Sequence, residues 1–217
     1  MDAQPEGAPH KDDAEPFDAA AAQALIEEAG GLRDHLQPDP RLLYGAWGLA
    51  WLLGYGTLAL TQNANGLPPA GAFVVFGALL LAAGVLTAVH ITRRSAGLRG
   101  ASTRAGVMYG ITWPISFVVV SVMVGALGNA GVDGEAMAIA ANGAFTILVG
   151  VLYMAGGAMY RDMTWFLLGV WIAVVAAVAG LAGLPALYWI MALAGGGGLL
   201  IRASIAVITQ ARTRGRA

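Results

Sequence analysis

Six apolar runs follow an acidic stretch of about 40 residues along this chain. A transmembrane helix needs about 20 consecutive apolar residues, and the runs cover about 41–61, 70–92, 106–127, 136–160, 164–183 and 187–208. Short polar or turn-forming breaks separate them, and Leu184-Pro185 joins the last two runs so tightly that they form a helical hairpin. The pattern predicts an all-α membrane protein with six transmembrane helices within residues 41–210.

The composition excludes an ordinary soluble enzyme. Hydrophobic residues make up 58% of the 217 residues and charged residues only 12%, about half of the usual share for a soluble domain. The chain has no cysteine, which excludes disulfides, thiolate metal sites and a cysteine nucleophile.

Charge is divided unevenly along the chain and predicts the orientation. Residues 1–41 hold ten of the thirteen acids and three of the twelve bases, whereas residues 42–217 have a net charge of +6. Past residue 42 the bases fall in alternate connections and at the C-terminal end, Arg202 lying near that side. The positive-inside rule places these connections and both termini in the cytoplasm.

Both ends of the chain differ from the apolar part. Residues 1–40 form an acidic cytoplasmic tail with a short helix expected near 18–29, and residues 211–217 form a basic tail. The acidic tail suits docking of a basic cytoplasmic protein. The basic tail suits a topology anchor, and we expect no nucleic-acid partner.

Similar residues begin the odd apolar runs, at Tyr44, Tyr109 and Leu168, and Ala-Gly pairs recur in the even runs. This favours three helical hairpins in parallel repeat, as some transporters use. The alternative is chance similarity, because few residue types make up these runs.

One helical stripe of aromatic side chains lies on the first run: Tyr44, Trp47, Trp51 and Tyr55. These four residues fall within an arc of about 80° at 100° per residue. One interpretation is packing against a glycine-rich neighbour. The other is an aromatic wall for an apolar or cationic ligand.

The run 136–160 has the most polar face, with Asn142, Thr146 and Tyr153 on one side at helical spacing. An intramembrane polar residue usually points into the bundle. It makes either an interhelical hydrogen bond or one wall of a substrate path.

Two runs contain residues that weaken a helix. Trp113-Pro114 in the third run predicts a kink, and the four glycines from Gly195 to Gly198 permit a kink, an unwound turn or close packing. Arg202 either extends to the membrane surface or contacts an anionic substrate. Transporters often place binding sites at such interruptions.

Catalytic and cofactor motifs are missing from the sequence. It contains no phosphate-binding loop, zinc-protease motif or serine–histidine pair, and no acid lies inside an apolar run. We therefore expect no enzyme activity, no cofactor and no metal.

Three segments resemble a group of small, uncharacterised actinobacterial six-helix integral membrane proteins that are often labelled transporters. The segments are Leu42-Leu43-Tyr44-Gly45-Ala46-Trp47-Gly48, the run from Tyr153 through Arg161-Asp162 to Trp171, and Met191 to Gly198. The resemblance implies a multi-pass protein of a bacterial plasma membrane, and it carries over no site residues.

Two functions remain open at this point. The first is a transporter or permease-like bundle, with a substrate path lined by Arg202, Asn142, Thr146, Tyr153, Trp113, Pro114, Gly195 and Gly198. The second is a non-transporting membrane subunit or regulator that docks a cytoplasmic partner on residues 1–41. Besides the lipid bilayer, a homo-oligomer or a membrane complex fits either function.

Overall fold

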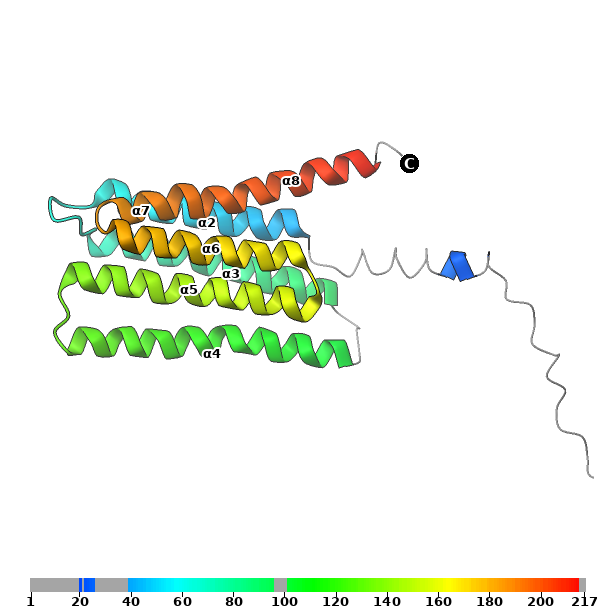
Figure 1. Cartoon of the computed structure of the whole chain (residues 1–217), viewed down its shortest axis with the longest axis horizontal. Coiled ribbons are helices and arrows are strands. Elements are labelled where there is room, and N and C mark those ends of the chain that lie inside the picture. The colour runs from blue at the N-terminus through cyan, green and yellow to red at the C-terminus, as the bar shows by residue number, and fades with distance from the viewer. Residues whose placement is uncertain (1–19, 21, 26–38, 96–100, 215–217) are drawn as a thin grey trace, which may run out of the picture. The chain divides into compact units, whose positions relative to one another are not determined.

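Helices make up all the regular structure in the described part of the chain (Figure 1). The computed structural model describes residues 20, 22–25, 39–95 and 101–214, and the chain divides into a first unit, residues 1–37, and a second, residues 38–217. In the first unit residues 20 and 22–25 are helical, while the rest of the predicted tail helix and residues 1–19, 21 and 26–38 of the expected docking segment lie outside the described residues.

The second unit is a bundle of antiparallel helices. They are α2 (Pro40–Thr61), α3 (Ala70–Ser95), α4 (Ala101–Asn129), α5 (Gly134–Tyr160), α6 (Met163–Ala182), α7 (Ala186–Ile190), the π-helical η1 (Met191–Gly196) and α8 (Gly197–Arg214). The last three follow one another without a break, so they form one long helix that changes its winding in the middle.

Five helical stretches in the described residues are long and apolar enough to cross a membrane: Ala70–Arg94, Arg104–Asn129, Gly134–Tyr160, Met163–Ala182 and Ala186–Arg212. The 22-residue α2 is not among them, although it is long enough. Its four glycines, two tyrosines and two tryptophans lower its mean hydropathy. The expected all-α membrane class is therefore found, with five of the six predicted spans.

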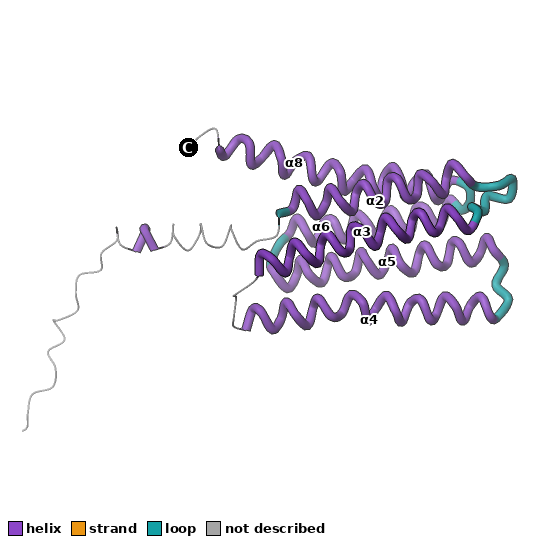
Figure 2. Tube along the Cα trace, turned by 180° about the vertical axis from the view of Figure 1, so that it is seen from behind, coloured by secondary structure: helices purple, strands orange, loops and turns teal. Residues whose placement is uncertain are grey.

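The helix termini gather at two ends of the bundle (Figure 2). We call one the arginine end, because Arg41, Arg93, Arg94, Arg104, Arg161 and Arg212 all lie in or beside helix termini there. The other is the loop end, formed by residues 62–69, 130–133 and 183–185.

Side-chain caps fix several helix starts. Asp39 accepts a hydrogen bond from the backbone of Arg41 at 3.0 Å, and Pro40 occupies the first helical turn, a position that suits proline. Asp162 caps α6 by accepting from the backbone of Trp165 at 3.0 Å. Arg161 ends α5 in a left-handed conformation with φ 57°. Arg161 and Asp162 therefore form a charged turn between α5 and α6.

Glycines allow the closest helix contacts. A Cβ on Gly196 would lie 2.6 Å from the backbone nitrogen of Leu52, so η1 and α2 meet backbone to backbone. A Cβ on Gly150 would lie 2.9 Å from the carbonyl oxygen of Gly169, which gives α5 and α6 a similar contact. Close backbone approach is the usual basis of helix association in lipid. Trp51, Leu58, Ile172, Leu187 and Met191 fill the core between these contacts.

The outermost helix is α4, which lies along α5 at one edge of the bundle in both views (Figures 1 and 2). It is helical without interruption through Pro114, whose side chain lies on an exposed face. The proline therefore does not break α4 into two segments. Helix α4 begins at Ala101 and α8 reaches Arg214, so both helices extend beyond the apolar runs that predicted them.

Candidate functional site

Four elements of the bundle meet along the aromatic stripe of α2. Tyr44 lies under the guanidinium of Arg202, and the indole of Trp47 donates to Thr87 Oγ1 of α3 at 2.9 Å. Trp51 is buried against Gly195. The ring of Tyr55 lies edge-on to the ring of Trp51, with 5.8 Å between the ring centroids. The stripe thus faces the interior of the bundle, and most of it serves packing.

At the far end of the stripe lies a group of buried polar side chains. The hydroxyl of Tyr55 donates to Asn142 Oδ1 of α5 at 2.7 Å, and Thr146, one turn along α5, interacts with the same hydroxyl. Tyr188 of α7 belongs to the same buried core as Tyr55, and α7 packs against α2. We call Tyr55, Asn142, Thr146 and Tyr188 the central polar cluster.

The central polar cluster is not internally satisfied. Asn142 Nδ2 and the Tyr188 hydroxyl are buried, and neither has a hydrogen-bond partner among the described residues. Asn142 is 8% exposed and Tyr188 is 2% exposed, so lipid and bulk water do not replace the missing partners. A buried polar group without a partner costs about 1–3 kcal/mol. The cluster therefore has two hydrogen-bonding groups that a further polar molecule can satisfy.

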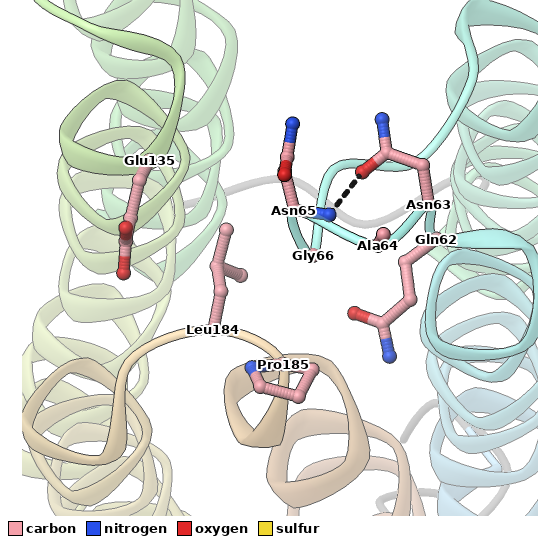
Figure 3. A pocket seen from close by; sticks show the side chains of 8 residues that line it. All are labelled: Gln62, Asn63, Ala64, Asn65, Gly66, Glu135, Leu184 and Pro185. Atoms are coloured by element: carbon pink, nitrogen blue, oxygen red, sulfur yellow. Dashed lines mark hydrogen bonds between the residues drawn. The ribbon is translucent and has the colours of Figure 1, made fainter.

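An open pocket of about 320 Å³ lies at the loop end (Figure 3). Its lining is mostly polar: Gln62, Asn63, Ala64, Asn65, Gly66, Glu135, Leu184 and Pro185. Asn63 Oδ1 accepts from the backbone of Asn65 at 2.9 Å and from that of Leu67 at 3.1 Å, which holds the loop in shape. Glu135 faces this loop from α5 across Leu184.

The pocket lies at the loop-end termini of the three helices that carry the central polar cluster, next to the end of α2 and the starts of α5 and α7. Gln62, the residue that follows α2, is seven residues beyond Tyr55, and Glu135 is seven residues before Asn142 on α5. Two helical turns correspond to about 10 Å along each helix. Buried Leu58 lies between the two levels on α2, and buried Leu187 precedes Tyr188. An apolar layer therefore separates an open polar pocket from a closed polar cluster below it.

Arg202 lies elsewhere in the bundle. Its Cζ is 5.5 Å from the centroid of the Tyr44 ring, and its buried Nε has no hydrogen-bond partner among the described residues. Tyr44 precedes Tyr55 by eleven residues, about 16 Å along α2 at 1.5 Å per residue. Arg202 and Asn142 therefore do not meet at a single site.

Tyr153 and Trp113 belong to a group of aromatic rings between α4, α5 and α6. Their centroids are 5.8 Å apart, and Tyr153 also lies 6.0 Å from Trp165. The hydroxyl of Tyr109 donates to the carbonyl oxygen of Leu152 at 2.7 Å. These rings attach α4 to its neighbours and do not reach the central polar cluster, and Pro114 faces outward.

Gly195 and Gly198 serve close packing and a change of helical winding. The four glycines begin inside η1, where the helix widens to π geometry. A Cβ on Gly195 would lie 2.9 Å from the Trp51 ring, and one on Gly198 would lie 2.5 Å from Trp171 Nε1. That same indole donates to the carbonyl oxygen of Ala194 at 3.1 Å. Wide turns of this kind occur frequently at functional sites.

Sequence reasoning missed one member of the cluster, Tyr188. A signal was available, because Tyr188 follows the turn at Pro185 and is the only tyrosine of its run. Its spatial relation to Tyr55 and Asn142 depends on which helices are neighbours, and hydropathy does not specify that. The loop-end pocket was likewise not predicted.

The helices define the class of this chain: a multi-pass helical membrane protein. Comparison with known proteins identifies no family, since no family model, no curated protein and no solved structure matches the chain. Among the described residues, no group of three or more His, Asp or Glu side chains is arranged to hold a metal ion.

Proposed function

We propose that this chain is a six-span transporter of small solutes in a bacterial plasma membrane, with both termini in the cytoplasm. The span that completes the six is α2, the first helix of the bundle, which packs against α3, α7, η1 and α8. Crowding of arginines at one end of the bundle supports the orientation, because basic residues stay on the cytoplasmic side.

One observation carries the transport function: a polar pocket open at the loop end lies next to the termini of α2, α5 and α7, the helices that carry the closed central polar cluster. In the proposed orientation the pocket faces outward. A solute would enter at the pocket, pass the apolar layer around Leu58, and reach Tyr55 and Asn142. Transporters commonly keep their binding site near the middle of the bilayer, behind a closed layer.

The test is solute entry into proteoliposomes, measured by light scattering after rapid mixing. Acetamide, acetate, acetamidinium, glycerol and small sugars form a first panel. We expect at least one to enter faster than into protein-free liposomes. The chain has no native cysteine, so Asn65→Cys at the pocket accepts a bulky thiol reagent at one place only. That modification is expected to slow entry.

Ala130→Cys is the matched control, because Ala130 is exposed in the 130–133 loop and does not line the pocket. Modification there should leave entry unchanged. Entry no faster than the lipid background for every solute, or equal slowing at both positions, would exclude the proposed function.

The rival function is a membrane subunit that docks a basic cytoplasmic protein on residues 1–41. It rests on the excess of acids in that segment. Purification in mild detergent from the native membrane, with and without residues 1–36, tests it. A stoichiometric partner that is lost with the deletion would support this function and replace the first proposal.

A further inference from the structure

The four side chains of the central polar cluster carry no charge. The cluster consists of two phenols, one amide and one hydroxyl, and no Asp, Glu, Lys, Arg or His belongs to it. Glu135 lies about two helical turns away, and Arg202 lies about three turns from Asn142 by the spacing along α2. Aromatic rings surround the cluster: Phe76 lies 4.5 Å from Tyr55 between centroids, and Trp51 adjoins it on the other side.

The two unpartnered groups have complementary demands. Asn142 Nδ2 is a donor and needs an acceptor, whereas the Tyr188 hydroxyl either donates or accepts. We propose that the central polar cluster binds a small uncharged solute of the amide or alcohol class, whose oxygen accepts from Asn142 Nδ2 and whose N–H or O–H donates to Tyr188. This deepens the proposed function by naming its substrate class.

Ions fit the cluster poorly for physical reasons. A charge transferred from water to a low-dielectric interior loses several kcal/mol unless a counter-charge compensates it. No counter-charge belongs to the cluster, and the free N–H of Asn142 repels a cation. A neutral amide meets both unpartnered groups without that penalty.

Acetamide, acetate and acetamidinium have nearly the same shape but differ in charge. Acetamide is neutral, acetate is an anion and acetamidinium is a cation, so differences in their binding report the effect of charge. Saturation-transfer NMR on the full-length protein in detergent reports which of them binds. We expect a signal for acetamide and background for the two ions.

Tyr188→Phe removes only the unpartnered hydroxyl, and Asn142→Leu removes the amide at similar volume. Each is expected to weaken acetamide binding about fivefold, the effect of one neutral hydrogen bond. Tyr160→Phe is the matched control, because Tyr160 is an exposed tyrosine of α5 outside the cluster. Its binding should equal that of the wild type. Tyr188→Phe carries the test if Asn142→Leu fails to fold.

Equal acetamide signals in all variants would mean that the cluster holds only structural water and would overturn the inference. Comparable binding of either ion would overturn it as well. The liposome assay separates this result from the proposed function. Cluster-dependent acetamide binding without entry supports the binding site and excludes transport, whereas entry of ions alone supports transport and excludes this substrate class.

Discussion

At the residue scale, two adjacent glycines have different roles. A Cβ on Gly196 would lie 2.6 Å from Leu52 N, 2.9 Å from Leu52 Cα and 3.1 Å from the Gly48 oxygen. These are backbone atoms, so they cannot move aside as a flexible side chain does. Around Gly197 there is no atom within 4 Å of an added Cβ, and its φ of −60° and ψ of −41° are those of an ordinary helix.

Gly196→Ala is therefore expected to destabilise the protein by about 1–3 kcal/mol, because α2 and η1 must separate to admit the methyl group. Gly197→Ala should stabilise it by about 0.5–1 kcal/mol, the usual gain when alanine replaces glycine inside a helix. Unfolding in mixed detergent and SDS measures both. Equal effects at the two positions would contradict the close contact at Gly196.

Asp39 caps α2 and also pairs with Arg41. The hydrogen-bonded guanidinium of Arg41 lowers the pKa of the Asp39 carboxyl from 3.8 to about 2, against an opposing contribution from burial. Because the folded-state pKa is depressed, the charged carboxyl stabilises the folded protein above about pH 4. That stabilisation is lost as the pH falls from about 4 to 2.

We expect Asp39→Ala to cost about 1 kcal/mol at pH 6, the usual cost of losing an N-cap. The difference from wild type should shrink steadily between pH 4 and pH 2. Unfolding of both proteins is measured at pH 6, 4 and 2. The contributions of all other carboxyl groups to the free energy of unfolding cancel in the difference between the two proteins. A difference that is constant with pH would show that the charge of Asp39 contributes nothing.

At the element scale, η1 changes the hydrogen bonding of the last long helix. The backbone N–H of Gly197 bonds to the oxygens of both Ala192 and Ala194, and the Trp171 indole adds a second donor to Ala194. In hydrocarbon no water is available to replace a lost donor. Trp171 therefore ties α6 to the widened turn, although its ring is partly exposed.

Trp171→Phe keeps most of the ring and removes the N–H. We expect a loss of about 1 kcal/mol, the net value of one hydrogen bond, measured by unfolding in mixed detergent. Trp189→Phe is the control, since Trp189 is similarly exposed and no hydrogen bond of its indole is found in the described residues. If the two substitutions have the same effect, the indole does not hold the π-helical turn.

At the scale of the whole molecule, the position of α2 decides between five and six spans. With six spans, residue 20 lies on the same side of the membrane as Arg212. With five spans, residue 20 lies on the same side as the 62–69 loop. The lack of native cysteines makes this difference measurable with single cysteine variants.

We expect a membrane-impermeant thiol reagent to label Ala64→Cys and Ala130→Cys in intact cells. Ala20→Cys and Arg212→Cys should react only after lysis. The unmodified chain serves as the blank. Labelling of Ala20→Cys in intact cells would place α2 outside the membrane and exclude the six-span topology.

The sequence predicted features that depend on local chemistry. Asp39, Pro40 and Asp162 are residue types favoured at helix starts, and they lie at the starts of α2 and α6, because caps act within one helical turn. Hydropathy placed the end of the last helix too early, since the Thr209–Arg212 segment is polar yet contains good helix formers. Asn142 stood out as an amide in an apolar run, but its partners Tyr55 and Tyr188 depend on helix neighbours. The same limit applies to the predicted substrate path, because the spacing between Arg202 and Asn142 depends on which helices are neighbours.

The edge position of α4 has a consequence for assembly. A membrane chain is inserted in order, so α4 enters the bilayer before α5, the helix on which it mainly packs. For that interval α4 must persist as a solitary helix among lipids. Its sequence suits this, since the stretch Arg104–Asn129 has no charged residue after its first position and has apolar side chains on every side. The Tyr109 and Trp113 rings then attach α4 to a bundle whose core is complete without it.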